Sequence, residues 1–163
     1  MTFVVSLLAN GLSWLLVVAF ALVLGGQVFD AVVLVPIWSS APPQSVSEWM
    51  KSPASTRVAE KFFARVLPVL LAASVLGLAA ALILGLSDRL ALALTGLCGI
   101  LHLGLVFLFF LPTNRALGFL PGEPADPSKF GQLIQKWLFW NRVRICLDVA
   151  GLIASVLAVS SSL

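Results

Sequence analysis

The sequence is poor in charged residues and in reactive side chains. Of its 163 residues only 10% are charged, none is a tyrosine, and one is a histidine. Soluble domains carry about 25% charged residues. Here 60% of the residues are hydrophobic, which is more apolar surface than a soluble core of this size could bury. We therefore predict an integral membrane protein with a single domain over residues 1–163.

The motifs of several enzyme and binding classes are also missing. Cys98 and Cys146 fall in separate apolar stretches, so we expect packing residues rather than a disulfide. The chain has no pair of histidines and no Glu-x-x-His motif, and we predict neither a metal nor a cofactor. Gly-x-Ser-x-Gly, phosphate-loop and dinucleotide motifs are absent. The net charge of +3 reflects membrane topology, so no nucleic-acid partner is expected.

Apolar stretches long enough to cross a bilayer make up most of the chain. Each reaches the roughly 20 residues that ~30 Å of hydrocarbon requires, and unpaired backbone groups cannot face lipid, so each must be helical. A very short connection joins the second and third stretches as an antiparallel hairpin. We predict an all-α, integral membrane, antiparallel four-helix bundle. Its helices cover residues 8–37, 62–86, 89–111 and 138–160.

Two longer loops, residues 39–60 and 112–136, separate these helices. In the first loop, residues 45–50 predict a short helical turn at the membrane surface. In the second, hydrophobic residues recur every three or four positions from Ser128 onward, which indicates an interfacial amphipathic helix before the fourth span. These hydrophobic residues are Phe130, Leu133, Ile134 and Trp137.

Basic residues are concentrated on the side of these two loops. Nine of the ten Lys and Arg lie in the loops or the adjoining helix turns, and only Arg89 lies opposite. The positive-inside rule then predicts cytoplasmic loops and outer N- and C-termini, on the periplasmic side if the membrane is a bacterial inner membrane. The loop residues that could contact anionic lipid or a partner subunit are Lys51, Arg57, Lys61, Lys129 and Lys136.

Polar side chains inside the spans lie at matching depths on the loop side. In the fourth span, Asn141, Arg144 and Asp148 are three and four residues apart, so they share one helix face. At about 1.5 Å per residue, the polar residues of all four spans lie within roughly 17 Å of one surface. The members are Asp30, Arg65 and Arg144 near the surface, Gln27, His102 and Asp148 deeper, and Asn114, Arg115, Asn141 and Arg142 at the opening.

The cost of such residues in lipid indicates a site. A central Arg or Asp costs about 2.5–3.5 kcal/mol on insertion scales, so intramembrane ionisable groups usually face the interior and mark function. We infer a polar pocket in the cytoplasmic half of the bundle and a dry outer half. The predicted catalytic residues are His102, Arg144, Asp148 and Asp30, and the predicted substrate-binding residues are Gln27, Arg65, Asn114 and Asn141.

Purely structural roles are open for each of these residues taken singly. The coincidence of depth across four spans, rather than any one residue, is what favours a site. The structural alternatives are an Arg144–Asp148 pair, an Asp30–Arg65 bridge between the first two spans, a helix cap by Asn114, and a hydrogen bond from His102 to a backbone carbonyl.

Three short motifs resemble a known family. They are Gly26-Gln27-x-Phe29 with Val35-Pro36-x-Trp38, Phe110-Leu111-Pro112-Thr113-Asn114, and Trp137 with Asn141-Arg142-x-Arg144. This pattern is similar to the small four-helix membrane family that includes the anthrone oxygenases, and the similarity spans nearly the whole chain. The resemblance implies oxygen-dependent oxidation of a polycyclic anthrone to a quinone without a bound cofactor.

The predicted function joins the pocket to this resemblance. His102 would accept a proton from a weak carbon or phenol acid, and Arg144, Asn114 and Asn141 would stabilise the oxyanion. The two buried aspartates would orient these groups. We therefore predict a cofactor-free oxidase or oxygenase acting on a lipophilic phenolic or quinone-type substrate.

Two other functions are open at this point. The protein could be a non-catalytic membrane protein that binds lipid or a partner subunit through its basic loops. It could also be an oligomeric channel or small transporter, which the dry outer half argues against. The expected partners are membrane lipid, a lipophilic small molecule and a second copy of the chain.

Overall fold

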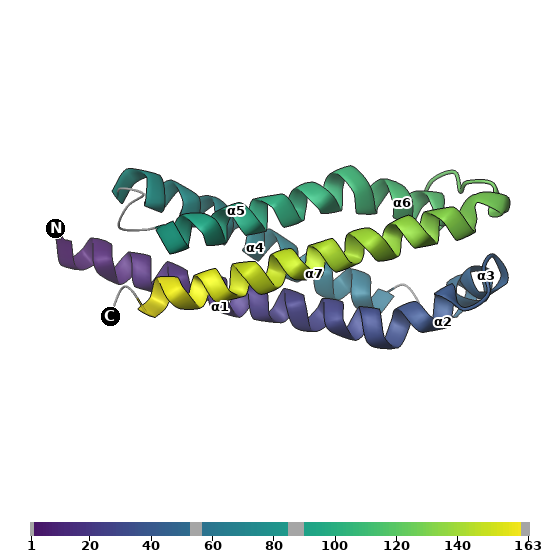
Figure 1. The fold of residues 1–163 in the computed structure, drawn as a ribbon, viewed down its shortest axis with the longest axis horizontal. Helices are drawn as coiled ribbons and strands as arrows, with labels where there is room; N and C mark the ends of the chain where they lie inside the picture. Colours follow the sequence, from purple (N-terminus) through teal and green to yellow (C-terminus); the bar gives the residue numbers. More distant parts are fainter. Residues whose placement is uncertain (1, 53–56, 85–89, 161–163) are drawn as a thin grey trace.

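Four long helical spans lie side by side along one axis (Figure 1). The computed structural model describes residues 2–52, 57–84 and 90–160, and all the regular secondary structure in these ranges is helical. The first span consists of α1 (Thr2–Phe29), η1 (Asp30–Leu34) and α2 (Val35–Ser39), and the second is α4 (Arg57–Leu84). The third consists of α5 (Leu90–Leu105), η2 (Val106–Phe110) and α6 (Leu111–Ala116), and the fourth is α7 (Phe130–Ser160). The shorter elements are α3 (Gln44–Lys51) and a 3₁₀ turn, η3 (Pro127–Lys129).

Each span is long and apolar enough to cross a membrane. The mean hydropathy of the four spans lies between 2.0 and 2.6. Large side chains on their outer faces are hydrophobic, and Leu108, for example, is 85% exposed. Apolar outer faces are expected where lipid replaces water. The chain is therefore an integral, multi-pass helical membrane protein, as its composition predicts.

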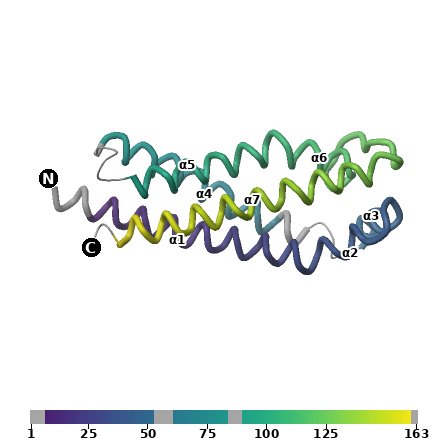
Figure 2. The backbone as a smooth tube through the Cα atoms, in the orientation of Figure 1, coloured from purple at the N-terminus to yellow at the C-terminus, as the bar shows by residue number. Residues whose placement is uncertain are grey.

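The chain path follows the predicted antiparallel order. The beginning of α1 and the end of α7 lie at one end of the bundle, which we call the terminal end (Figure 2). The α2–α3 segment and the connection from α6 to α7 lie at the opposite end, which we call the loop end (Figure 2). The connection predicted to form a tight hairpin, at residues 85–89, lies outside the described residues. α3 confirms the short helical turn expected in the first loop.

Two π-helical turns extend the first and third spans beyond simple α-helices. η1 and η2 are each followed, two residues later, by a proline, Pro36 and Pro112 respectively. A proline ring inside an α-helix meets the carbonyl four residues earlier, and the wider π turn relieves that contact. The third span therefore continues past the proline to Ala116, five residues beyond its predicted end.

The fourth span begins with the helix expected from Ser128 onward, and the two form one continuous helix, α7, from Phe130 to Ser160. The amphipathic pattern is present, but Phe130, Ile134 and Trp137 are buried against protein. The pattern identified the buried face correctly, and its partner is the end of the first and third spans rather than the membrane surface.

Small residues bring the spans together at the terminal end. A Cβ atom on Gly96 of α5 would lie 2.7 Å from the backbone oxygen of Ser74 in α4, and a Cβ atom on Gly151 of α7 would overlap the ring of Phe20 in α1. Such close approach is typical of membrane helix packing. The core here is apolar, as predicted for the dry half, and it comprises Leu16, Ala19, Phe20, Val23, Leu70, Ala73, Ala81, Leu92, Ala93 and Ala158.

An aromatic core closes the loop end. The Trp38 and Trp137 rings meet edge to face with centroids 5.2 Å apart, and Phe110 meets Trp137 at 5.5 Å. The hydroxyl of Ser45 donates to the backbone oxygen of Trp38 at 2.7 Å, which holds α3 against α2. Between this aromatic core and the apolar core of the terminal end lie the buried polar residues and a cavity.

Candidate functional site

A cavity of about 350 Å³ lies between the spans toward the loop end. Ligand pockets typically measure about 300–1,000 Å³, so its size suits one small molecule. Both π-helical turns contribute to its wall. The polar lining residues are Asp30, Asn114 and Arg144, and the remaining ones are Leu34, Trp38, Trp49, Phe63, Ala64, Leu67, Val106, Phe110, Leu111, Phe119, Leu120 and Trp137.

Arg144 is the cationic residue of this cavity. One terminal nitrogen (Nη2) donates to Oδ1 of Asn141 at 2.7 Å, and the guanidinium carbon lies 4.1 Å from the centre of the Phe110 ring. The two residues of the hydrogen bond are three apart on α7, so they share a helix face. Arg144 is only 8% exposed. Its positive charge is therefore fixed by a hydrogen bond and an aromatic face rather than by water.

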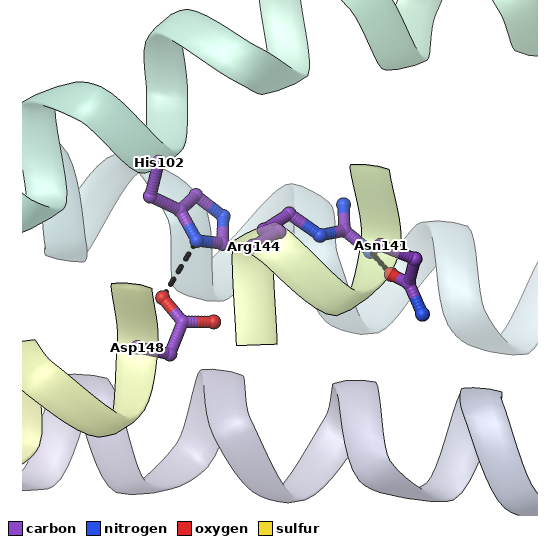
Figure 3. A network of polar contacts seen from close by, with 4 residues as sticks. All are labelled: His102, Asn141, Arg144 and Asp148. Atoms are coloured by element: carbon purple, nitrogen blue, oxygen red, sulfur yellow. Dashed lines mark hydrogen bonds and ion pairs between the residues drawn. The ribbon is translucent and has the colours of Figure 1, made fainter. Parts of the chain in front are cut away.

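A buried His–Asp pair lies one helical turn farther toward the terminal end. Nδ1 of His102 is 2.7 Å from Oδ1 of Asp148, and both side chains are inaccessible to solvent. When Asp148 is ionised its oxygens only accept, and the hydrogen of this contact then belongs to Nδ1. Figure 3 shows the Arg144 side chain extending away from this pair toward Asn141. Asp148 thus pairs with His102 rather than with Arg144.

Asn114 is held in place at the loop end of the cavity. Nε1 of Trp137 donates to the amide oxygen of Asn114 at 3.0 Å, and both residues line the cavity. The amide nitrogen of Asn114 keeps its donors for another partner. Because α6 continues to Ala116, Asn114 lies inside the helix and does not serve as its cap.

Comparison with known families identifies the chain. The family model described as anthrone oxygenase matches residues 54–154, which is more than half of the sequence. The chain belongs to the anthrone oxygenase family. No curated protein and no solved structure matches it. The matched residues include the cavity's Asn114 and Arg144 and the His102–Asp148 pair, whereas Asp30 and Gln27 precede the match.

In this anthrone oxygenase family member, the cavity brings together part of the predicted site. Asp30, Asn114 and Arg144 come from three different spans and line one space. Asn141 is buried and holds Arg144, so its contact with the cavity is indirect. Asp30, Asn114 and Arg144 therefore meet inside the bundle as their matching depths indicate, and the catalytic and substrate-binding roles of these residues stay predictions.

Other predicted residues lie elsewhere. Arg65 is exposed, is not among the cavity-lining residues, and forms no ion pair with Asp30 within the described part of the chain. Its position on α4 turns it outward, which depth alone could not reveal. Gln27, His102 and Asp148 are fully buried, but they lie beside the cavity rather than on its wall. Arg115 and Arg142 at the opening are exposed.

The aromatic walls were not predicted as site residues. A tryptophan at the end of a span is typical of an interfacial anchor, yet Trp38 is only 3% exposed and lines the cavity. Trp49 and Phe119 come from segments between spans, where a sequence pattern gives no inward direction. The signal that could have found them is the gathering of aromatic residues near both loops. Among the described residues, no three His, Cys, Asp or Glu side chains gather closely enough to hold a metal ion, and the two cysteines are free.

Proposed function

We propose that this protein binds a lipophilic tricyclic phenol or anthrone in the cavity and catalyses its oxidation by dioxygen. The observation that carries the proposal is a cavity of about 350 Å³ with aromatic walls, a fixed guanidinium and an amide. Membership of the anthrone oxygenase family supports the same substrate class. A flat aromatic ligand suits walls that include Trp38, Phe110 and Trp137, because aromatic rings pack favourably on one another.

The chemistry that this site favours begins with loss of a proton. An anthrone has a CH₂ group conjugated with its ketone, so removing one proton moves negative charge onto the ketone oxygen. Arg144 and Asn114 would donate to that oxygen, and one such donor typically contributes about 10²–10³ in rate. The electron-rich ring then transfers electrons to dioxygen and forms a C–O bond. Protonation gives a hydroperoxide, and loss of water leaves the quinone, so one anthrone and one dioxygen give one quinone and one water.

The buried lining restricts which ligands the cavity favours. Asp30 supplies the carboxyl group of the lining, while Arg144 supplies the guanidinium. A permanently charged ligand would bring a further charge into this low-dielectric space, which is costly, whereas a neutral ligand would not. The ligand becomes anionic only when its oxygen lies beside Arg144. We therefore expect neutral, weakly acidic molecules to bind, and permanently charged ones to be excluded.

A binding experiment tests the proposal. The probe is 1,8-dihydroxyanthraquinone, a product-like phenol, added to the protein in lipid nanodiscs while tryptophan fluorescence is recorded. Trp38, Trp49 and Trp137 line the cavity, so binding quenches their emission. Arg144→Gln should weaken binding at least tenfold. The matched control is Arg142→Gln, an exposed arginine two residues away, which should bind like the unmodified protein. Equal affinities of the two variants would contradict the proposal.

The alternative is a non-catalytic protein that binds anionic lipid through the loop end, which we propose faces the cytoplasm by the positive-inside rule. The observation that favours it is the exposure of Lys51, Lys129 and Lys136 there. If this alternative is correct, changing these three lysines to glutamine abolishes binding to vesicles containing phosphatidylserine, while Arg144→Gln has no effect on any measured activity. Our proposal predicts instead that Arg144→Gln weakens phenol binding and that changing the three lysines does not.

A further inference from the structure

A group of buried polar atoms beside the cavity has no partner in the described protein. Buried polar groups are hydrogen-bonded to protein or to ordered water in the great majority of cases, and water bound in this way is part of the structure. These atoms come from all four spans, so they surround the centre of the bundle rather than one helix. They are both amide atoms of Gln27, Oγ of Ser74, Nε2 of His102, Nε of Arg144 and Oδ2 of Asp148.

Helix packing places the His–Asp pair at a known level in the bundle. The ring of Phe20 is a close neighbour of both Gly99 and Gly151, which sets one level across α1, α5 and α7. His102 is three residues beyond Gly99, and Asp148 is three residues before Gly151. Since α5 and α7 run antiparallel (Figure 1), both lie one turn nearer the loop end, which agrees with their contact of 2.7 Å.

Gln27 lies at a level between the His–Asp pair and the cavity. Gln27 is seven residues beyond Phe20, and Arg144 is seven residues before Gly151, on antiparallel helices. Each lies about 10 Å nearer the loop end at 1.5 Å per residue, so the two residues are level with each other. Asp30, three residues farther along than Gln27, lines the cavity. By this count the Cα atom of Gln27 lies about one turn nearer the terminal end than that of Asp30, and about one turn nearer the loop end than that of His102.

The unpartnered atoms of the His102–Asp148 pair face the level of Gln27 and Arg144. In Figure 3, Nε2 of His102 and Oδ2 of Asp148 both lie on the side of the pair toward Arg144, whereas Nδ1 and Oδ1 face each other. With the proton on Nδ1, the neutral imidazole presents Nε2 as an acceptor. An amide such as Gln27 both donates and accepts, so it can orient a water molecule toward Nε2 and toward the cavity.

We propose that His102 is the proton acceptor of the reaction and that water held at Gln27 connects it to the cavity, an inference that rests on the proposed function. The C–H bond of the substrate CH₂ group breaks, and its electron pair stays on the ring as the enolate beside Arg144. The proton passes through water to Nε2 of His102. The imidazolium keeps its Nδ1–H on Asp148, which positions the ring as in a Ser-His-Asp triad. After dioxygen adds, the proton returns and completes the hydroperoxide.

Spectroscopy of the one histidine in the sequence tests this directly. Protein labelled with ¹⁵N-histidine gives ring-nitrogen signals from His102 alone. Without ligand, we expect Nδ1 to be protonated and Nε2 to be unprotonated. Saturating 1,8-dihydroxyanthraquinone should bind as its phenolate, seen as a red-shifted absorption band, and Nε2 should become protonated. Nε2 that is protonated before ligand is added, or that stays unprotonated with phenolate bound, overturns the relay and leaves the binding proposal intact.

Kinetics with anthrone provide the second test. His102→Asn keeps an amide N–H near the position of Nδ1 and removes the acceptor at Nε2. Because general bases contribute about 10²–10⁴ in rate, kcat should fall by that factor while KM stays unchanged, since His102 does not line the cavity. Ser155→Ala is the matched control, since Ser155 is buried on α7, the helix that carries Asp148, and its hydroxyl donates to the backbone oxygen of Leu152 at 2.7 Å.

The outcomes separate the two proposals. If His102→Asn keeps its kcat and Asp30→Asn loses it, Asp30 is the acceptor and the relay is wrong, while the proposed function stands. If the unmodified protein neither binds the phenol nor oxidises anthrone, the proposed function is wrong, and the relay is wrong with it because no proton donor remains. Loss of kcat in Gln27→Leu, with rescue in Gln27→Asn, would support the position given to the water.

Discussion

Replacing His102 by leucine should destabilise the bundle far more than the loss of one hydrogen bond. Interhelical hydrogen bonds in membrane proteins contribute about 0.6 kcal/mol on average and at most about 1.7. Leaving a buried carboxylate without a hydrogen-bond partner costs about 3 kcal/mol or more, above the cost for a neutral group. Among the described residues Oδ2 of Asp148 already has no partner, and Oδ1 would lose the donor that lies 2.7 Å away. The larger value applies because the carboxylate would then be buried with neither oxygen paired.

A double-mutant cycle separates this effect from lost packing. The double variant, with leucine at both His102 and Asp148, removes the uncompensated carboxylate and should recover most of the loss, because an apolar pair of similar volume is often neutral. The assay is reversible unfolding in mixed micelles, followed by tryptophan fluorescence, with Ser155→Ala as the reference. The reasoning would be refuted if His102→Leu lowered the free energy of unfolding by less than about 1 kcal/mol. It would also be refuted if the double variant lost more stability than the two single variants together.

Three further predictions concern packing, the cavity and pH. Gly96→Ala should cost about 1–3 kcal/mol in the same unfolding assay, since its Cβ atom would lie 2.7 Å from the α4 backbone, whereas Gly104→Ala, with open space around it, should cost nothing. Trp137→Phe removes the donor to Asn114 and should weaken phenol binding severalfold by titration. Hydrogen bonds from the following turn hold the pKa of Asp126 below its usual range, so amide NMR should show this turn intact at pH 5 and lost only as the pH falls through the lowered pKa.

Membrane residence and the polar face of α7 could be predicted because each rests on a short-range rule. Hydropathy and length define a span, and a spacing of three or four residues defines a helix face. The same rules identified Arg144 and Asp148 as interior residues. They could not choose between the partners of Asp148, because the distance to His102 depends on the level at which α5 packs against α7, which Gly99, Gly151 and Phe20 determine.

The errors have equally specific causes. Depth says nothing about rotation around a helix axis, so Arg65 was placed in the site although it faces outward. Pro112 reads as the end of a helix unless a π turn precedes it, and that turn follows from tertiary packing rather than from a sequence motif. The burial of the amphipathic face at the beginning of α7 and the burial of Trp38 have the same cause. The loop end carries its own aromatic core, so its hydrophobic residues pack against protein instead of the membrane surface.

The most direct test of the account is turnover of anthrone by the purified protein in nanodiscs under ¹⁸O-labelled dioxygen. The account predicts quinone formation above the rate in protein-free nanodiscs, one dioxygen consumed per anthrone, and one ¹⁸O atom in each quinone. It also predicts that Arg144→Gln loses this activity while Arg142→Gln keeps it. A folded protein that oxidises anthrone no faster than empty nanodiscs, or a quinone without the label, would contradict the central claim.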